Sequence, residues 1–259
     1  MIQVEHLHKS FGDLTVLQDI NLEIRDGETT AIIGRSGSGK SVLMKHFVGL
    51  LTPDQGRVLV DGTDLNTIPY EQLRELRRSF GVLFQGGALF DSMTAFENIA
   101  FPIRNFTRST ETAVRDRVHE CLDLVNLSDI DNKKPSELSG GMRKRVALAR
   151  AIALQPRYIL YDEPTSGLDP ETSNTIDELI YSLSKELNVT SVVVTHDMHS
   201  VLTIADRVAF LHETRLRWIG AVDAIHERED PVLDAFVQAN QYQIGNPSAA
   251  IAPGSPSSS

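Results

Sequence analysis

Residues 34–41 read Gly-Arg-Ser-Gly-Ser-Gly-Lys-Ser and match the pattern G-x-x-x-x-G-K-[ST]. An apolar run, Thr-Thr-Ala-Ile-Ile, precedes them and a helical pattern follows. In such a strand–loop–helix unit, backbone amides close around phosphate groups, the lysine reaches the β- and γ-phosphate oxygens, and the last hydroxyl ligates Mg²⁺. A glycine-rich turn that matches by chance is the alternative, and the flanking strand and helix argue against it. The predicted phosphate-binding residues are Gly34, Arg35, Ser36, Gly37, Ser38, Gly39, Lys40 and Ser41, with Ser41 also a metal ligand.

Apolar runs near the N-terminus predict a β-rich beginning. Ile2–Leu7, Val16–Ile24 and Glu28–Ile33 have the patterns of strands. We expect a hairpin turn at Asp26–Gly27 between the last two. The first part of the chain is therefore predicted to form an antiparallel β subdomain.

Later in the chain, strand and helix patterns alternate. Strand patterns at 158–161, 191–195 and 208–211 are separated by helical ones such as Pro170–Leu187, which predicts a parallel sheet covered by helices. Between about residues 86 and 155, apolar residues recur at three- and four-residue spacing, most clearly in Thr112–Val125 and Met142–Leu154. This segment is predicted to be an inserted α-helical subdomain of an α/β fold.

The composition restricts the class of protein. Hydrophobic residues make up 41% and charged residues 23% of 259 residues, which is typical of a globular chain with one core and a subdomain. There are 35 acidic residues against 25 basic ones, for a formal charge of −10, which argues against nucleic acid as a partner. The single cysteine, Cys121, excludes an internal disulfide and is expected to be buried among its apolar neighbours.

The two ends of the chain carry few structural signals. No basic-then-apolar leader precedes the first strand pattern, and no run approaches the roughly 18 apolar residues of a membrane span. We therefore expect a cytosolic chain that relies on another polypeptide for any membrane-spanning part. From Asn246 the sequence is Pro, Ser, Gly and Ala without periodicity, so residues 1–240 are predicted to form the domain and 241–259 a disordered tail.

A second candidate site follows the apolar run at residues 158–161. Asp162 and Glu163 end this strand pattern, where strand ends in α/β sheets form ligand crevices. Asp162 suits Mg²⁺, and Glu163 is the candidate to polarise a water that attacks the γ-phosphate. A solvated acidic strand end is the alternative, and it would be preferred without the sequence Pro-Thr-Ser-Gly-Leu-Asp that follows at 164–169.

Residues 138–151, LSGGMRKRVALARA, predict a helix that opens with a serine and two glycines. Glycine costs backbone entropy at such a position. Exposed amides at a helix N-terminus, with the positive end of the helix dipole, form an anion site. A simple serine N-cap is the alternative reading.

Together these motifs resemble the ATP-binding subunits of ABC transporters over residues 2–240. The resemblance implies a P-loop NTPase (RecA-like) core and ATP hydrolysis with Mg²⁺. It also implies a homodimer in which two subunits enclose two ATP molecules. In that arrangement Ser139, Gly140 and Gly141, part of the signature motif, cap the γ-phosphate that is held by the partner's phosphate loop.

The same resemblance implies roles for further residues. Gln85 in VLFQGG matches the glutamine loop, which senses Mg²⁺ and water and is linked to the membrane partner. Asp169 in SGLD matches the aspartate that communicates across the dimer, and His196 matches the switch histidine that contacts the γ-phosphate. The implied catalytic set is Lys40, Gln85, Glu163 and His196, and the implied metal set is Ser41, Gln85 and Asp162. A structural histidine at a strand end is the alternative for His196.

Two residues depart from the family pattern. Phe11 stands where an aromatic, more often tyrosine, stacks on adenine, and a core aromatic is the alternative. Met142 replaces the usual glutamine of the signature motif. The basic run at residues 143–145 would suit anionic lipid, but we interpret it as a solvated helix face.

The segments FQGGALFDSMTAFENIAFPI, GKSVLMKHFVGLL and LSGGMRKRVALARA resemble the ATPases of Mla-type systems, which move phospholipids between bacterial membranes. This implies an integral membrane permease that docks near Gln85, with Ala88-Leu89-Phe90 and Ala100-Phe101 as lining candidates or buried core. It also implies a peripheral location on the cytoplasmic face of the inner membrane, a periplasmic lipid-binding protein and a small regulatory subunit. A helix pattern at Asp230–Tyr242 is a candidate to steady the dimer or a regulatory partner. The alternatives are an importer of a polar solute, a soluble ABC protein of DNA repair or ribosomes, and a nucleotide-using kinase.

Overall fold

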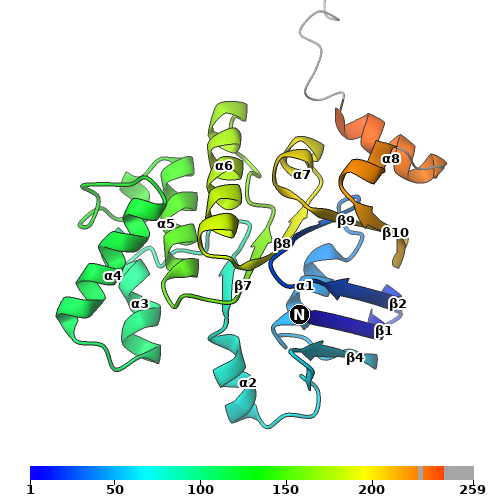
Figure 1. The fold of residues 1–259 in the computed structure, drawn as a ribbon, viewed down its shortest axis with the longest axis horizontal. Coiled ribbons are helices and arrows are strands. Elements are labelled where there is room, and N and C mark those ends of the chain that lie inside the picture. Colours follow the sequence, from blue (N-terminus) through cyan, green and yellow to red (C-terminus); the bar gives the residue numbers. More distant parts are fainter. Residues whose placement is uncertain (227–229, 242–259) are drawn as a thin grey trace, which may run out of the picture.

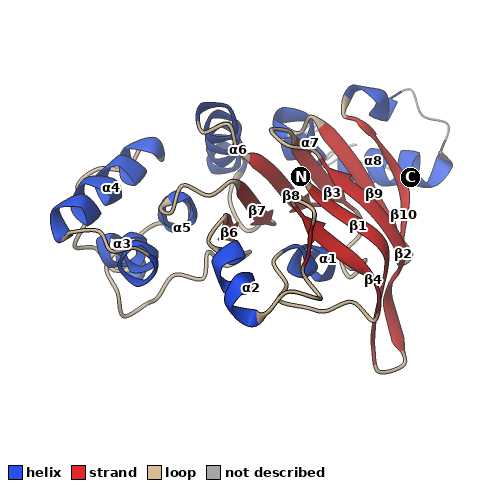
Figure 2. Ribbon diagram, turned by 60° about the horizontal axis from the view of Figure 1, so that its bottom comes forward, coloured by secondary structure: helices blue, strands red, loops and turns tan. Residues whose placement is uncertain are grey.

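The computed structural model describes residues 1–226 and 230–241, and it contains an antiparallel sheet and a mainly parallel one (Figures 1 and 2). The N-terminal sheet has the order β2-β1-β4-β5, and every neighbouring pair in it is antiparallel. The predicted antiparallel β subdomain is therefore confirmed. Its strands are β1 (Ile2–Phe11), β2 (Leu14–Ile24), β4 (Gln55–Val60) and β5 (Thr63–Asp64).

The second sheet has six strands in the order β10-β9-β3-β8-β7-β6. Neighbouring strands are parallel except for β10, which is antiparallel to β9. Every residue of β3, β7 and β8 is buried, as expected where helices cover both faces of a parallel sheet. The strands are β3 (Thr29–Ile33), β6 (Phe80–Leu83), β7 (Tyr158–Asp162), β8 (Thr190–Thr195), β9 (Arg207–His212) and β10 (Arg215–Ala221).

The predicted hairpin at Asp26–Gly27 is wrong. The strand before it, β2, pairs with β1, whereas the strand after it, β3, pairs with β8 and β9. The turn therefore passes from one sheet to the other. The Arg157 guanidinium, just before β7, fixes it by donating to Asp26 over 2.8 Å. The alternating burial of β2 against the complete burial of β3 is the pattern that separates the two strands.

Helices cover the sheets and form a separate group beside β6 and β7 (green in Figure 1). In that group α3, α4 and α5 contact one another around a core that includes Ile99, Val118 and Leu148. Cys121 is fully buried there, as predicted, and burial raises the pKa of its thiol to about 12. The helices are α1 (Lys40–Phe47), α2 (Tyr70–Arg77), α3 (Ala95–Phe106), α4 (Glu111–Leu124), α5 (Gly140–Ile152), α6 (Pro170–Glu186), α7 (Met198–Ile204) and α8 (Pro231–Gln241), with short 3₁₀ turns at Pro135–Glu137 and Asp223–His226.

The predicted tail at 241–259 lies outside the described residues except for Gln241, the last residue of α8, and Tyr242 of the predicted C-terminal helix also lies outside them.

The parallel strands place the candidate residues at one edge of the sheet. Because β3, β6, β7 and β8 run in the same direction, the segments that follow them emerge at the same edge. The phosphate loop follows β3, Gln85 follows β6, Glu163 follows β7 and His196 follows β8. The fold thus gathers four segments that are far apart in the sequence into the crevice where α/β proteins bind ligands.

Candidate functional site

The phosphate loop turns from β3 into α1 through glycines in conformations that other residues disfavour. Gly39 precedes α1 with φ +99°, and a Cβ there would stand 2.9 Å from a Leu17 methyl group. A Cβ at Gly34 would stand 2.3 Å from the carbonyl oxygen of Leu211. Among the described residues, the buried Ser38 hydroxyl finds no hydrogen-bond partner. The loop therefore offers free polar groups at a helix start, which fits an anionic phosphate.

Lys40 lies under this loop with only 6% of its surface exposed. Its Nζ donates to the carbonyl oxygens of Gly34, at 2.8 Å, and Arg35, at 3.1 Å. Burial lowers the pKa of the ammonium, and the Glu163 and Asp162 carboxylates oppose that effect. The loop thus holds a desolvated positive charge beside two carboxylates, a setting in which electrostatic interactions are stronger than in water.

Ser41 and Asp162 form the oxygen-rich part of the site. The Ser41 hydroxyl, in the first turn of α1, donates to Asp162 Oδ1 over 2.8 Å. Asp162 ends β7 and is 9% exposed. A hydroxyl and a carboxylate are oxygen donors of the type that Mg²⁺ prefers, so the pair fits this metal.

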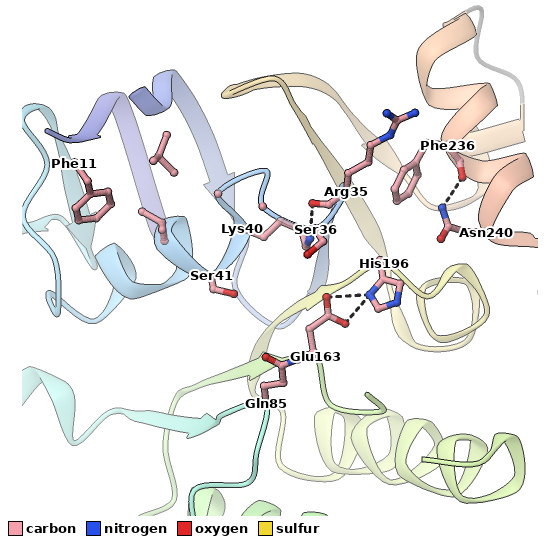
Figure 3. A pocket seen from close by; sticks show the side chains of 14 residues that line it. Phe11, Arg35, Ser36, Lys40, Ser41, Gln85, Glu163, His196, Phe236 and Asn240 are labelled. Atoms are coloured by element: carbon pink, nitrogen blue, oxygen red, sulfur yellow. Dashed lines mark hydrogen bonds and ion pairs between the residues drawn. The ribbon is translucent and has the colours of Figure 1, made fainter. Parts of the chain in front are cut away.

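Glu163 follows β7 with φ +48°, the left-handed region that a residue with a side chain rarely adopts. Its N–H donates to the Val194 carbonyl oxygen at 2.8 Å, which ties the strained peptide to β8. His196 Nδ1 donates to both carboxylate oxygens, at 2.9 and 3.1 Å (Figure 3). Glu163 and His196, predicted from separate motifs, therefore lie together. Backbone strain of this kind concentrates at functional sites.

A cleft of about 600 Å³ is lined by Glu163, His196 and six residues of the phosphate loop: Arg35, Ser36, Gly37, Gly39, Lys40 and Ser41. Of the predicted loop and metal residues, Gly34, Ser38 and Asp162 do not line it. Gln85 lies beside Glu163, and Phe11 lies at one end of the cleft (Figure 3). Phe11 is 47% exposed, so the alternative reading as a core aromatic is wrong, and Lys9 Nζ stands 5.5 Å from the centre of its ring. Phe236 and Asn240 of α8 also line the cleft, which sequence reasoning missed. The helix pattern at the C-terminus was visible, but its place over the cleft depends on packing between α8 and α7.

Ser139, Gly140, Gly141 and Asp169 lie elsewhere, because within the described residues they do not line this cleft. Ser139 is the N-cap of α5, and its hydroxyl accepts the Met142 N–H at 3.2 Å. Asp169 is the N-cap of α6 and accepts the Thr172 N–H at 2.9 Å. The serine N-cap is thus present. The Met142 side chain packs against the core of the helical group.

Gly141 also has a packing reason to be glycine. A Cβ on it would stand 2.5 Å from the Thr172 methyl group of α6, and one on Gly140 would stand 3.3 Å from Leu168. The two helices approach closely at this point. Packing against α6 therefore favours glycine at position 141, whatever this residue does for a partner, and leaves little space for a side chain at position 140.

The predicted solvated face at residues 143–145 is wrong for its middle residue. Lys144 is 6% exposed, and its Nζ donates to the carbonyl oxygens of Gln85 and of Glu163, the latter at 3.3 Å. Its position on α5 explains the burial: Gly141, Lys144, Leu148 and Ala151 share one buried face at three- and four-residue spacing. That periodicity is the sequence signal that could have identified it.

Residues 17–166 match the family model described as ABC transporter. The chain belongs to the ABC transporter family. It is 42% identical over 244 residues to the probable ribonucleotide transport ATP-binding protein mkl of Mycobacterium leprae, covering 94% of this chain and 70% of that one. It is also 42% identical over 230 residues to the intermembrane phospholipid transport system ATP-binding protein MlaF of Haemophilus influenzae, covering 89% and 87%.

A solved structure agrees with this assignment. The ATP-binding cassette MJ0796, in a dimeric post-hydrolysis state bound to ADP and Pi, matches with a TM-score of 0.79 and 34% sequence identity over 86% of this chain and 99% of that one. The ABC-type fold and ATPase class predicted from the motifs are therefore confirmed. None of the helices in the described part of the chain is long and apolar enough to cross a membrane.

Proposed function

We propose that this ABC ATPase dimerises on ATP, hydrolyses it and powers an integral membrane permease. The observation that carries the proposal is that the phosphate loop and the Glu163–His196 pair line one cleft, with Asp162 hydrogen-bonded to Ser41 of that loop. Phosphoryl transfer needs positioning and charge stabilisation, and this cleft provides both.

Each group in the cleft has a distinct task in hydrolysis. The loop amides and Lys40 bind the triphosphate, and Phe11 stacks on the adenine. Ser41, Asp162 and Gln85 would hold Mg²⁺, which would neutralise phosphate charge. Glu163 accepts the proton of the attacking water, and His196 holds that carboxylate in place and reaches the γ-phosphate.

The position of the signature residues supports a dimer. Ser139, Gly140 and Gly141 begin α5 outside the cleft of their own chain, so they are available to the nucleotide of a second copy. We infer that they cap the γ-phosphate of the partner, with Asp169 at the same interface. The solved structure of MJ0796 is dimeric, which supports this arrangement.

A second cavity supports docking of a permease. A groove of about 520 Å³ lies between α2 and α3, and its lining includes Phe84, the residue that precedes Gln85. Phe84, Phe90 and Tyr70 expose 36 to 66% of their surfaces there, and exposed apolar side chains that gather in this way mark interaction sites. Of the candidate lining residues, Ala88, Phe90 and Phe101 line this groove, whereas Ala100 is buried and Leu89 packs against the core. Four arginines complete the lining: Arg74, Arg77, Arg78 and Arg150.

Phospholipid is the cargo that we propose, with a periplasmic lipid-binding protein and a small regulatory subunit as further partners and a peripheral place on the cytoplasmic face of the inner membrane. The identity to MlaF over 89% of the chain supports it. The equal identity to mkl, whose name refers to ribonucleotides, supports an importer of a polar solute as the second candidate.

Purification of the tagged chain with its permease from native membranes distinguishes the two cargo candidates. Stimulation of hydrolysis by phospholipid supports the first, stimulation by a solute receptor supports the second, and recovery with ribosomes alone contradicts both.

The variant Glu163→Gln tests the mechanism. We expect hydrolysis to fall about 100-fold or more, because the amide cannot take the proton, while a dimer accumulates with ATP and Mg²⁺. Phosphate release and light scattering measure the two effects. Glu178→Gln, an exposed change on α6, is the control. Hydrolysis near the wild-type rate, or a strictly monomeric variant at saturating ATP, contradicts the proposal.

A further inference from the structure

Lys144 occupies a position that the mechanism above does not use. It stands one turn into α5, whose first residues are the signature glycines. Its ammonium is buried and donates to two carbonyl oxygens from different segments, Gln85 after β6 and Glu163 after β7. One side chain thus joins three segments of the site.

The charges around Lys144 explain how it is held there. Burial lowers the pKa of the ammonium, and the Asp162 and Glu163 carboxylates oppose that effect. Lys40 of α1 faces the same two carboxylates. The two acids and the two buried lysines therefore balance in charge, which reduces the cost of burying any one of them.

The two arginines beside Lys144 serve other contacts. Arg143 donates to the Leu138 carbonyl oxygen at 2.6 Å, and Arg145 donates to that of Asn126 at 3.0 Å. Both of these bonds stay within the helical group. Lys144 is therefore the member of the basic run that reaches from α5 to the cleft.

The hydrogen bond from Lys144 is the second one to the backbone of the strained residue Glu163. The Glu163 N–H is bound by Val194 of β8, and the Glu163 carbonyl oxygen is bound by Lys144 of α5. A shift of α5 relative to β8 consequently acts on the backbone that carries the catalytic carboxylate. Gln85 is tied to the same ammonium, so it follows the same shift.

We propose that Lys144 is a positioning residue that locks Gln85 and Glu163 to the signature helix, so that contact of α5 with the partner's nucleotide and alignment of Glu163 over its own nucleotide occur together. This inference rests on the proposed dimeric function. It assigns to one buried ammonium a link between the two ATP sites of the dimer.

The experiment compares full-length Lys144→Met, Lys144→Arg and Lys144→Gln with wild type and with Arg145→Met as the matched control on the same helix. We expect Lys144→Met to bind a fluorescent ATP analogue with affinity within about twofold of wild type, because the phosphate loop is untouched. We expect kcat to fall about 10- to 100-fold through misplacement of Glu163, and the Hill coefficient for ATP to fall towards 1. Lys144→Arg keeps a donor and restores part of both quantities, and Arg145→Met leaves both unchanged.

A second measurement separates positioning from folding. In the Glu163→Gln background, Lys144→Met should require more ATP for half-maximal dimerisation, although each chain still binds nucleotide. If Lys144→Met fails to fold, Lys144→Gln is judged by the same criteria. The inference is overturned if the Lys144 variant keeps the wild-type kcat or an unchanged Hill coefficient. It is also overturned if nucleotide affinity falls by as much as kcat. Failure of Glu163→Gln itself to stop hydrolysis and trap a dimer would instead reject the proposed function.

Discussion

The N-termini of α1 and α5 both contain glycine, but they differ in whether an N-cap side chain accepts a hydrogen bond from their backbone amides. The N-cap of α1 is Gly39, which has no side chain to accept a hydrogen bond, and this helix begins inside the cleft. The N-cap of α5 is Ser139, whose hydroxyl accepts the Met142 N–H, and this helix begins outside the cleft. The difference supports the proposal that the start of α1 binds a ligand within its own chain and that the start of α5, besides packing against α6, contacts a partner.

The first half of this comparison is tested by Lys40→Met. The ammonium donates to the loop carbonyl oxygen of Gly34, and Met replaces the lysine with an unbranched apolar side chain that has no donor. We expect hydrolysis to fall about 100- to 1,000-fold and nucleotide affinity to fall as well, because a buried donor to the phosphates is lost. Phosphate release and analogue binding measure the two. Lys45→Met, exposed at the other end of α1, should change neither, and retained affinity in Lys40→Met would contradict the assignment.

The second half is tested at Gly141. Gly141→Ala brings a Cβ to 2.5 Å from the Thr172 methyl group, so we expect a loss of about 1–3 kcal/mol in the free energy of unfolding. Hydrolysis should fall about 10- to 100-fold while single-chain nucleotide affinity stays near wild type, because the cleft of that chain is intact. Denaturant unfolding and the assays above measure these effects.

A double variant then divides packing from partner contact. Thr172→Ser removes the clashing methyl group and keeps the hydroxyl that donates to Asp169 over 2.7 Å. In Gly141→Ala/Thr172→Ser we expect stability to return and hydrolysis to remain low. Recovery of both would show that the glycine serves the chain's own packing alone.

A smaller effect is expected at the base end of the cleft. Phe11→Ala should lower ATP affinity about 10-fold, since stacking of a base on an aromatic ring is lost, whereas Phe11→Tyr should stay within about twofold. Calorimetric binding of ATP measures this change. Inorganic triphosphate is the control ligand, because it has no base and should bind both variants equally. A weaker affinity of Phe11→Ala for triphosphate would place Phe11 in the phosphate half instead.

The sequence predicted the parts of this site that are defined by neighbouring residues, such as the phosphate loop and the Asp162–Glu163 pair. It also predicted β3, β7, β8 and β9 of the mainly parallel sheet, where burial gives apolar runs, but it did not predict the short strand β6. The predictions missed α2, which has no buried residue and so no apolar stripe, and β10, which has no fully buried residue. Such elements are fixed by their neighbours rather than by their own pattern.

Long-range placement was harder to predict than local chemistry. The hairpin at Asp26–Gly27 was expected because a turn signal between two strand patterns does not state which sheet each strand joins. Lys144 was predicted to face solvent because it is charged, and its position on the buried face of α5 was not considered. In both cases the deciding partners lie more than fifty residues away in the sequence, β9 for the strand and Gln85 for the lysine.

The smallest predicted effect concerns α6, which packs between α5 and α7. Asp177 is fully buried in it, and Ser200 of α7 donates to Asp177 Oδ2 over 2.7 Å. In the described part of the chain, Oδ1 finds no partner. Burial, with the nearby Asp197 charge, raises the pKa of Asp177 to about 6. The folded state therefore favours the protonated acid, so its contribution to stability is full below the ordinary pKa of 3.8 and is lost as the pH rises from there to about 6.

Asp177→Asn removes this ionisation and keeps a group that accepts from Ser200. At pH 7.5 we expect the variant to exceed wild type by about 1 kcal/mol in the free energy of unfolding. This is less than the full effect of the shift, because the new amide nitrogen takes the place of the Asp177 oxygen that lacks a partner. Below about pH 4 the advantage should disappear, since Asp177 is then protonated in the folded and the unfolded chain alike. Urea unfolding across this range measures it, with Glu178→Gln as the exposed control. An equal difference at both pH values would show that packing, and not the charge of Asp177, causes the change in the free energy of unfolding.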